Sequence, residues 1–393
     1  MNNNILKSGV QHFINKNMNT DIMSVLLKKP VFEAISQKEL VEQLEAKKKC
    51  QHKLPTWFKT PNIYYPNKRN IEQSSSEKTA RYKANLVHGK TLLDSTGGFG
   101  IDTFFFSKKI DQVFHCELDE NLSQIATHNL KILGVRNCTF VFEDSINFVM
   151  HYPLNFDWIY MDPSRRNRQK EKVFLLEDYE PPVLQNLDIL FTKTTYILLK
   201  SSPLLDIKQG IAELKYVKEV HIVAVNNEVK ELLWILESEF KGSVCIKTVN
   251  LKNNHTQTFN FKIADEAKAK ILLDSPKSFL YEPNTAILKA GAFKTLGEAL
   301  KLRKLHQHSH LYTSENHFPH FPGRSFKIIK TIAATKKKFK SLGIIKANIT
   351  VRNFPETVAT IRKKYGIQDG GDSYLFFTTD NANQKVVILC AKV

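Results

Sequence analysis

A glycine-rich turn near residue 97 constrains the fold of this chain more than any other stretch. Residues 90–93 predict a short buried strand and residues 103–109 predict a helix, so the turn joins a strand to a helix. Gly97, Gly98 and Gly100 let the backbone bend sharply and approach a ligand where a Cβ would collide. The first N–H groups of the following helix are free to bind that ligand. A strand, a glycine turn and a helix in this order are typical of the opening of a nucleotide-binding βαβ unit.

A second predicted strand, 112–117, ends in Glu117, about twenty residues past the first glycines. An acid at this distance is placed to accept hydrogen bonds from ribose hydroxyls. The dinucleotide fingerprint requires Gly-x-Gly-x-x-Gly, whereas here Gly-Gly-Phe-Gly follows Asp94 after two residues. The Asp94 carboxylate would repel a pyrophosphate but can bind the ammonium of a methionine moiety. The element therefore resembles the cofactor loop of class I S-adenosylmethionine methyltransferases rather than an NAD site.

Further apolar segments alternate with helical patterns, and each ends in a polar cluster. This alternation predicts an α/β fold with a mostly parallel sheet covered on both faces. Ligand and substrate are then expected beyond the carboxyl ends of the strands. The later strands are expected at 139–142, 156–161, 195–199 and 219–225, with a crossover helix at 122–133. The polar clusters at the strand ends are 94–102, 117, 144, 162–166, 200–203 and 226–228.

The composition points to a polyanionic partner. A chain of 393 residues predicts two or three domains, and a hydrophobic content of 42% supports real cores. The net charge of +18 and the pI near 9.5 favour nucleic acid as the partner. A generally lysine-rich proteome is the alternative explanation.

Cysteines, histidines and apolar runs indicate neither a metal nor a membrane. The five cysteines form no CxxC pair, so we expect reduced thiols in a cytoplasmic protein. The polar N-terminus lacks the core of a signal peptide, and no apolar run approaches the length of a membrane span. Five histidines between 306 and 320 lack cysteines or carboxylates at fixed spacing, so no metal is expected there.

Four segments are expected along the chain. The first looks helical and lysine-rich, and a solvated helical tail is the alternative to a small accessory domain. The third and fourth change to a shorter α+β pattern. The expected boundaries are 1–72 for the helical accessory domain, 73–269 for the Rossmann-like domain, 270–323 for a small α+β domain and 324–393 for a basic α/β domain.

Local patterns add detail to these segments. Residues 54–57 are expected to form a loop, and Ser74 is expected to cap a helix over 78–87 with Glu77 reaching back. Two further strands, at 243–251 and 258–263, are expected to form the antiparallel edge of the sheet.

The C-terminal segment carries more than half of the excess charge. Residues 324–393 hold 14 Lys and Arg against 4 Asp and Glu, an excess of 10. Lys336, Lys337 and Lys338 precede Phe339, so charge and an aromatic ring are interleaved. This segment is the better candidate for gripping nucleic acid, because phosphate contacts supply affinity without reading sequence.

The predicted fourth strand is followed by the residues that we expect to carry chemistry, Asp162, Pro163, Ser164 and Arg165. Class I methyltransferases place here the group that meets the methyl acceptor. A carboxylate and a rigid carbonyl can hold an amine so that its lone pair faces the donor, and orientation provides much of the rate. Many amino methyltransferases have an aromatic ring in this turn, which this chain lacks. Arg165 can stack on a base or bind phosphate, or else form an ion pair with Glu171 or Glu177.

Two other strand ends are informative. Ser201 stands where uridine C5 methyltransferases place a nucleophilic cysteine, so a covalent cysteine mechanism is not expected. Asn227 and Glu228 are expected at the start of a helix over 227–232, where they point into an acceptor pocket. Capping by Asn227 and an exposed helix face are the alternative.

Together these residues resemble a bacterial family of S-adenosylmethionine-dependent methyltransferases with a C-terminal THUMP-like domain. The resemblance implies a Rossmann-like catalytic domain, a small ferredoxin-like domain and a THUMP-like domain, and THUMP domains proper are associated with RNA. The catalytic part is also distantly similar to cap guanine N2 methyltransferases, which implies an amino nitrogen as acceptor. The segments that carry the resemblance are 74–80, 94–102, 162–166, 227–232, 281–283, 322–324 and the basic tail.

The sequence therefore predicts an S-adenosylmethionine-dependent methyltransferase acting on a base amine of transfer or ribosomal RNA. A methyltransferase for a small molecule or protein, and a non-catalytic RNA-binding protein with a vestigial pocket, are the alternatives. Asp162 and Pro163 are expected to position the acceptor. The expected cofactor residues are Asp94, Thr96, Gly97, Gly98, Gly100, Asp102, Glu117 and Asp144, and the expected substrate residues are Ser164, Arg165, Arg166, Asn227, Lys336, Lys337 and Lys338.

Overall fold

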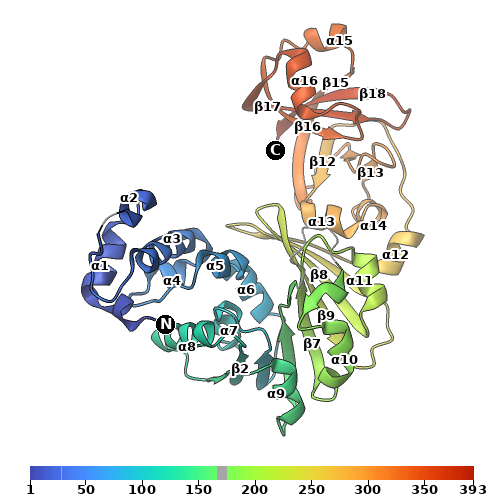
Figure 1. The fold of residues 1–393 in the computed structure, drawn as a ribbon. Coiled ribbons are helices and arrows are strands. Elements are labelled where there is room, and N and C mark those ends of the chain that lie inside the picture. The colour runs from blue at the N-terminus through green and yellow to red at the C-terminus, as the bar shows by residue number, and fades with distance from the viewer. Residues whose placement is uncertain (28, 166–174) are drawn as a thin grey trace. The chain divides into compact units, whose positions relative to one another are not determined.

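The computed structural model describes residues 1–27, 29–165 and 175–393 (Figure 1). The chain forms two compact units, and strands β8 and β9 contribute residues to both. The first unit comprises Met1–Lys218 and Leu233–Lys241, and the second comprises Glu219–Leu232 and Gly242–Val393. Among the described residues, no helix is both long enough and apolar enough to span a membrane.

The N-terminal segment is helical, as predicted. α3 (Gln37–Lys53) begins with a capping box between Ser36 and Glu39, which satisfies two free N–H groups at its start. The loop expected at 54–57 is wrong, because Pro55 opens the helix α4 (Pro55–Lys59), where proline fits the first turn. The other helical elements are η1 (Asn3–Leu6), α1 (Ser8–Lys16), α2 (Ile22–Leu26) and α5 (Lys68–Gln73).

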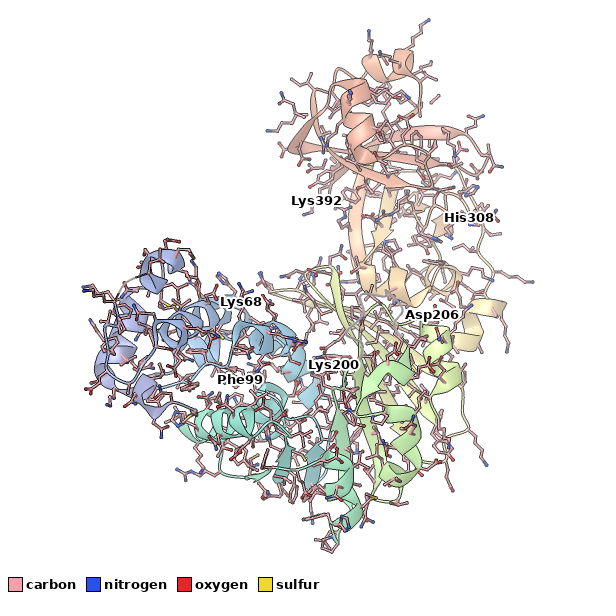
Figure 2. The ribbon with its side chains drawn as sticks, in the orientation of Figure 1. Lys68, Phe99, Lys200, Asp206, His308 and Lys392 are labelled. Carbon is pink, nitrogen blue, oxygen red and sulfur yellow. The ribbon has the colours of Figure 1, made fainter. Side chains whose placement is uncertain are left out.

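Trp57 of α4 is fully buried and packs edge-on against Phe104, with ring centroids 4.9 Å apart. It also contacts Phe99, a residue of the glycine turn that Figure 2 labels, with ring centroids 6.3 Å apart. Aromatic contacts of this kind add to the free energy of burial. The N-terminal helices are thus anchored to the turn that organises the sheet.

The helix after this segment, α6 (Glu77–Ala84), begins two residues later than its predicted cap implies. Ser76 is the N-cap and accepts a hydrogen bond from the Thr79 N–H, whereas Ser74 ends the preceding helix. Glu77 does not reach back to the cap but accepts hydrogen bonds from the N–H and hydroxyl of Thr56. The predicted cap at Ser74 is therefore wrong, because the preceding helix α5 extends to residue 73.

The first unit contains the predicted parallel sheet. Its strands run in the order β7-β4-β1-β2-β3, and each pair is parallel. All five carboxyl ends therefore lie at the same edge of the sheet. The strands are β1 (Thr91–Asp94), β2 (Gln112–Cys116), β3 (Cys138–Val141), β4 (Phe156–Met161) and β7 (Thr194–Ser201). The helices between and after them are α7 (Ile101–Phe106), α8 (Glu120–Ile132), α9 (Ser145–His151), α10 (Val183–Phe191) and α11 (Ile207–Glu213).

The second unit begins with a further group of strands. β11 (Thr256–Lys262) is antiparallel to β10 (Cys245–Leu251) and forms the predicted antiparallel edge, whereas β10 itself is parallel to β8 (Val217–Val225). The helix expected at 227–232 is wrong, because β9 (Glu228–Glu237) occupies these residues. Asn226 and Asn227 both have positive φ, 50° and 67°, and form the tight turn that leads into it. Asparagine tolerates this left-handed conformation better than most residues.

The rest of the second unit is built on a seven-stranded sheet in the order β13-β14-β12-β15-β18-β17-β16. β12 (Phe279–Pro283) pairs with β15 (Gly323–Ala333), so the predicted segments 270–323 and 324–393 share one sheet. Leu280, Leu305 and Phe326 also belong to one buried cluster. The other strands are β13 (Arg303–Lys304), β14 (Tyr312–Ser314), β16 (Lys346–Arg352), β17 (Gln368–Thr379) and β18 (Lys385–Lys392), and the helices are α12 (Ile263–Lys268), α13 (Thr285–Ala290), α14 (Lys294–Ala299), α15 (Lys336–Lys340) and α16 (Val358–Tyr365).

Candidate active site

The turn between β1 and α7 contains three glycines, Gly97 because of a neighbouring side chain and Gly98 and Gly100 because of their backbone conformation. The Gly97 N–H donates to the Cys116 carbonyl of β2 (2.8 Å), which holds the turn against the neighbouring strand. A Cβ at position 97 would lie 2.4 Å from Nε2 of the buried His115. Gly98 and Gly100 have φ of 54° and 79°, a region that residues with a Cβ rarely adopt.

Asp94, at the end of β1, is a buried carboxylate directly beneath this turn. It is 1% exposed and accepts hydrogen bonds from the Thr103 hydroxyl (2.6 Å) and the Thr96 N–H (3.3 Å). Burial, helped by the carboxylates of Asp102 and Asp162, raises the pKa of Asp94 to about 7 against the hydrogen bond from Thr103. A positively charged ligand beside Asp94 would favour the ionised form.

Asp102, in the first turn of α7, forms a buried ion pair. Its carboxylate lies 3.0 Å from Nζ of the fully buried Lys83 and accepts hydrogen bonds from Ser75 (2.8 Å) and the Tyr160 hydroxyl (3.0 Å). Burial opposes ionisation, but the charges of Lys83 and Lys200 outweigh it and lower the pKa of Asp102. Its carboxylate thus links α6, α7 and β4. Contact between Asp102 and a cofactor stays a prediction.

Glu117 and Asp144 follow β2 and β3 at the same edge. Glu117 Oε2 accepts a hydrogen bond from the Gly98 N–H (2.8 Å), so the structure brings the predicted ribose acid onto the glycine turn. Asp144 is the exposed N-cap of α9 and accepts from the Asn147 N–H (2.9 Å). A carboxylate oxygen that accepts one hydrogen bond retains capacity for another.

The turn after β4 meets the glycine turn directly. The Asp162 N–H donates to Thr96 Oγ1 at 2.6 Å. The Asp162 carboxylate forms an ion pair with Nζ of Lys200, the last but one residue of β7, at 2.5 Å. Pro163 is buried and Ser164 is exposed. The structure therefore brings together the predicted cofactor turn and the predicted acceptor turn.

Lys83, Lys200 and Thr103 were not among the residues that the sequence singled out for the site. A lysine in a helix usually faces solvent, and only the tertiary fold shows that Lys83 is buried against an acid. Lys200 belongs to the predicted polar cluster 200–203 at the end of the fifth predicted strand, but the sequence pattern assigns it no role of its own. Ser201, beside it, accepts a hydrogen bond from the buried Trp234 Nε1 (2.8 Å).

The predicted substrate residues fall in different places. Ser164 and Arg165 form the short strand β5, paired with β6 (Tyr179–Glu180), while Arg166 and Glu171 lie outside the described residues. Lys336, Lys337 and Lys338 are exposed on α15, but Phe339 is buried, with ring centroids 4.5 Å from Tyr365. That ring is therefore not available for stacking on a base.

Asn227, in the second unit, has internal partners. Its N–H donates to Asn250 Oδ1 (2.8 Å) and its side-chain oxygen accepts from the Thr285 N–H (3.0 Å). Of the clustered histidines, His306 contacts the Asn383 side chain (2.9 Å) and His310 stacks on Phe293. Within the described ranges, no three His, Cys, Asp or Glu side chains gather as a metal site would require.

A fold of this kind, with a glycine turn and a neighbouring acidic turn at the carboxyl edge of a parallel sheet, is that of the class I methyltransferases. The chain is similar to a solved protein from Porphyromonas gingivalis W83 that is described as a candidate methyltransferase. The two are 32% identical, the match covers 99% of this chain and 98% of that chain, and the TM-score is 0.90. The chain therefore belongs to the family of that protein, class I methyltransferases with a THUMP-like domain.

Two family models match the second unit. Residues 279–322 match a ferredoxin-like domain and residues 323–392 match a THUMP-like domain. These matches confirm the predicted ferredoxin-like and THUMP-like parts.

Other comparisons add little. A candidate methyltransferase from Escherichia coli is 17% identical, with 44% of this chain and 89% of that chain covered and a TM-score of 0.31. A candidate rRNA methylase from Clostridium thermocellum is 15% identical, with 41% and 95% covered and a TM-score of 0.30. Neither likeness bears on the function of the chain. A search of curated proteins finds no match.

Proposed function

We propose that this chain transfers a methyl group from S-adenosylmethionine to a base amine of transfer or ribosomal RNA. The observation that carries the proposal is the hydrogen bond from the Asp162 N–H to Thr96 Oγ1. It holds the turn expected to meet the acceptor against the turn expected to meet the cofactor. An in-line methyl transfer requires the donor and the acceptor to be held in a fixed relative position, and two turns joined in this way can hold them so.

The residues around the glycine turn fit S-adenosylmethionine. This cofactor would supply an electrophilic methyl group on a sulfonium. Asp94 is buried, burial raises its pKa, and no cation in the described part of the chain forms an ion pair with it. We assign to Asp94 the ammonium of the cofactor, to Glu117 the ribose hydroxyls and to Asp144 the adenine amine.

Asp162 is assigned the acceptor amine. Its ion pair with Lys200 holds Oδ2, and Oδ1, which accepts no hydrogen bond from the described residues, is assigned the exocyclic N–H of the acceptor. A hydrogen bond of this kind orients the amine so that its lone pair faces the cofactor. The buried Pro163 has a fixed φ and restricts the backbone of Asp162 before it, and so limits the orientations available to the Asp162 carboxylate.

RNA as the substrate is supported by charge and by the THUMP-like part. Residues 324–393 carry 14 Lys and Arg against 4 Asp and Glu, and the match to a THUMP-like domain covers nearly the same residues. Cationic side chains supply affinity for phosphates through release of counterions.

The proposal is tested by comparing modified nucleosides in RNA from cells with and without the gene. We expect one methylated nucleoside to disappear with the gene and to reappear when purified protein and S-adenosylmethionine are added to the unmodified RNA. Asp162→Ala should bind S-adenosylhomocysteine but fail to restore the nucleoside. Unchanged RNA together with cofactor binding would favour a small-molecule or protein substrate. Unchanged RNA without cofactor binding would favour a non-catalytic RNA-binding protein.

A further inference from the structure

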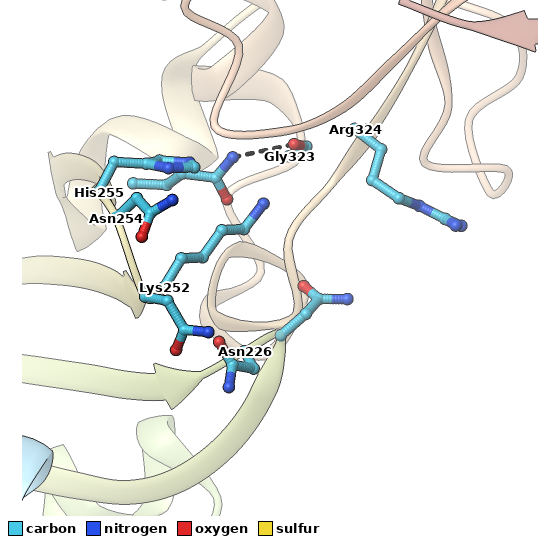
Figure 3. A pocket seen from close by; sticks show the side chains of 9 residues that line it. Asn226, Lys252, Asn254, His255, Gly323 and Arg324 are labelled. Atoms are coloured by element: carbon cyan, nitrogen blue, oxygen red, sulfur yellow. Dashed lines mark hydrogen bonds between the residues drawn. The ribbon is translucent and has the colours of Figure 1, made fainter.

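A pocket lies wholly within the second unit, at the carboxyl ends of β8 and β10 (Figure 3). Its volume is about 380 Å³, within the range of ligand pockets, which starts near 300 Å³. Three backbone segments form it: the turn at Asn226 and Asn227, the turn 252–255 between β10 and β11, and the start of β15 at Gly323 and Arg324.

The lining of this pocket has an unusual composition. Five of the nine lining residues have amide side chains, two have cationic side chains and one is His255. None of the nine is acidic. The walls are fixed by internal hydrogen bonds. Gln257 Nε2 donates to the Gly323 carbonyl (2.9 Å, dashed in Figure 3), and Asn227 bonds to Asn250 and Thr285. The pocket is therefore preformed rather than built from loose surface side chains.

Lys252 is the principal charge in the pocket. Figure 3 shows its side chain reaching from the end of β10 into the space among the labelled residues, whereas Arg324 extends away from them. Arg324 is paired with the buried Glu282, which also binds Arg352. Burial, together with the charges of Lys392 and Arg324, lowers the pKa of Lys252. No carboxylate in the described part of the chain forms an ion pair with it, so its charge is uncompensated.

We propose that this pocket binds one nucleotide of the substrate RNA, with a backbone phosphate on Lys252 and the base against the amides. An uncompensated ammonium among cations attracts phosphate. Side-chain amides carry a donor and an acceptor side by side and match the edges of bases, while the exposed His255 ring offers a stacking surface. The proposal rests on the proposed function, since it assumes that RNA is the substrate.

The test is RNA binding measured by fluorescence anisotropy, with the full-length protein and RNA from cells that lack the gene. Lys252→Glu should weaken binding about tenfold or more and reduce the slope of log affinity against log salt by about 1. Lys262→Glu is the matched control, because Lys262 is exposed at the far end of β11 and makes the same change of charge outside the pocket. It should leave the affinity close to that of the wild type.

Both variants should unfold at the wild-type temperature and bind S-adenosylhomocysteine normally. Adenosine monophosphate should compete with RNA at lower concentrations than inorganic phosphate, since it also offers a base. If the wild type binds RNA and Lys252→Glu binds it equally well, the pocket proposal is overturned while the proposed function stands. Equal competition by inorganic phosphate overturns base recognition. If the wild type binds no RNA, the proposed RNA substrate fails as well.

Discussion

The backbone N–H of Asp162 lies 2.6 Å from Thr96 Oγ1 and donates a hydrogen bond to it. Thr96 belongs to the turn after β1 and Asp162 to the turn after β4, and these two strands are parallel neighbours. The contact therefore locks two loops that come from residues 66 positions apart.

Removing the Thr96 hydroxyl should slow methyl transfer more than it weakens cofactor binding. Thr96→Ala leaves the Asp162 N–H without its partner, and a loss of about 1 kcal/mol predicts a rate about five times lower. Thr96→Ser keeps the hydroxyl and serves as the control. Single-turnover transfer to RNA and calorimetry with S-adenosylhomocysteine measure the two effects. Equal rates for the Ala and Ser variants would contradict the assigned role of the bond.

Cofactor affinity should increase with pH and level off near neutrality. Because burial raises the pKa of Asp94 to about 7, the carboxyl is protonated at lower pH and must lose a proton to pair with the cofactor ammonium. Below pH 7 the dissociation constant should thus fall about tenfold per pH unit, and above it the constant should be flat. Calorimetry with S-adenosylhomocysteine across this range measures the effect.

Asp94→Asn is the control for this pH dependence. The amide is close in shape and does not titrate, so affinity should be weak and independent of pH. The stability of the free protein should change with pH in the opposite direction to the cofactor affinity. A folded pKa above the ordinary value means that Asp94 contributes less stability as pH rises from about 4 to 7. A wild type and an Asn variant with the same pH profile would rule out Asp94 as the titrating group.

Breaking the buried Lys83–Asp102 pair should destabilise the first unit. Lys83→Met leaves the Asp102 carboxylate buried without its cation, which typically costs about 3 to 5 kcal/mol. Adding Asp102→Asn removes that charge and should recover part of the loss. All three tryptophans, Trp57, Trp158 and Trp234, lie in the first unit, so tryptophan fluorescence during urea unfolding reports on it alone. A Lys83→Met protein as stable as the wild type would show that the pair does not support the fold.

Adding a methyl group to Gly97 should weaken cofactor binding, because the new Cβ would collide with His115. A Cβ at this position would lie 2.4 Å from the imidazole of a fully buried residue on β2, so the turn has to shift. Overpacking of this kind costs about 1 to 3 kcal/mol. Gly97→Ala should therefore bind S-adenosylhomocysteine at least about tenfold more weakly. The double variant Gly97→Ala, His115→Ala restores the space and should recover binding; failure to do so would place the defect elsewhere.

The main features of the site could be predicted because each depends on a short stretch of sequence. Gly97, Gly98 and Gly100 after an apolar run indicate a turn, and the regular alternation of strands and helices places Asp94 and Asp162 at one sheet edge. The ion pairs could not be predicted, because nothing local distinguishes the buried Lys83 from a solvated lysine. Only tertiary packing brings its ammonium to an acid.

The errors have physical causes of the same kind. Residues 227–232 carry charges typical of a helix start, but two asparagines in the left-handed region turn the chain back into β9. Lys336–Lys340 looked like charge interleaved with an aromatic ring, but Phe339 packs into the core beneath the lysines. In both places the pattern of charged side chains does not reveal the feature that decides the structure, which is a left-handed turn in the first and a buried aromatic ring in the second.

The measurement that tests the central claim most directly is a crystal structure of this protein with S-adenosylhomocysteine bound. We expect the ligand over the turn Asp94–Gly100, with its ammonium at Asp94, its ribose at Glu117 and its sulfur facing Asp162. Ligand bound elsewhere at saturating concentration, or a sulfur directed away from Asp162, would contradict the account.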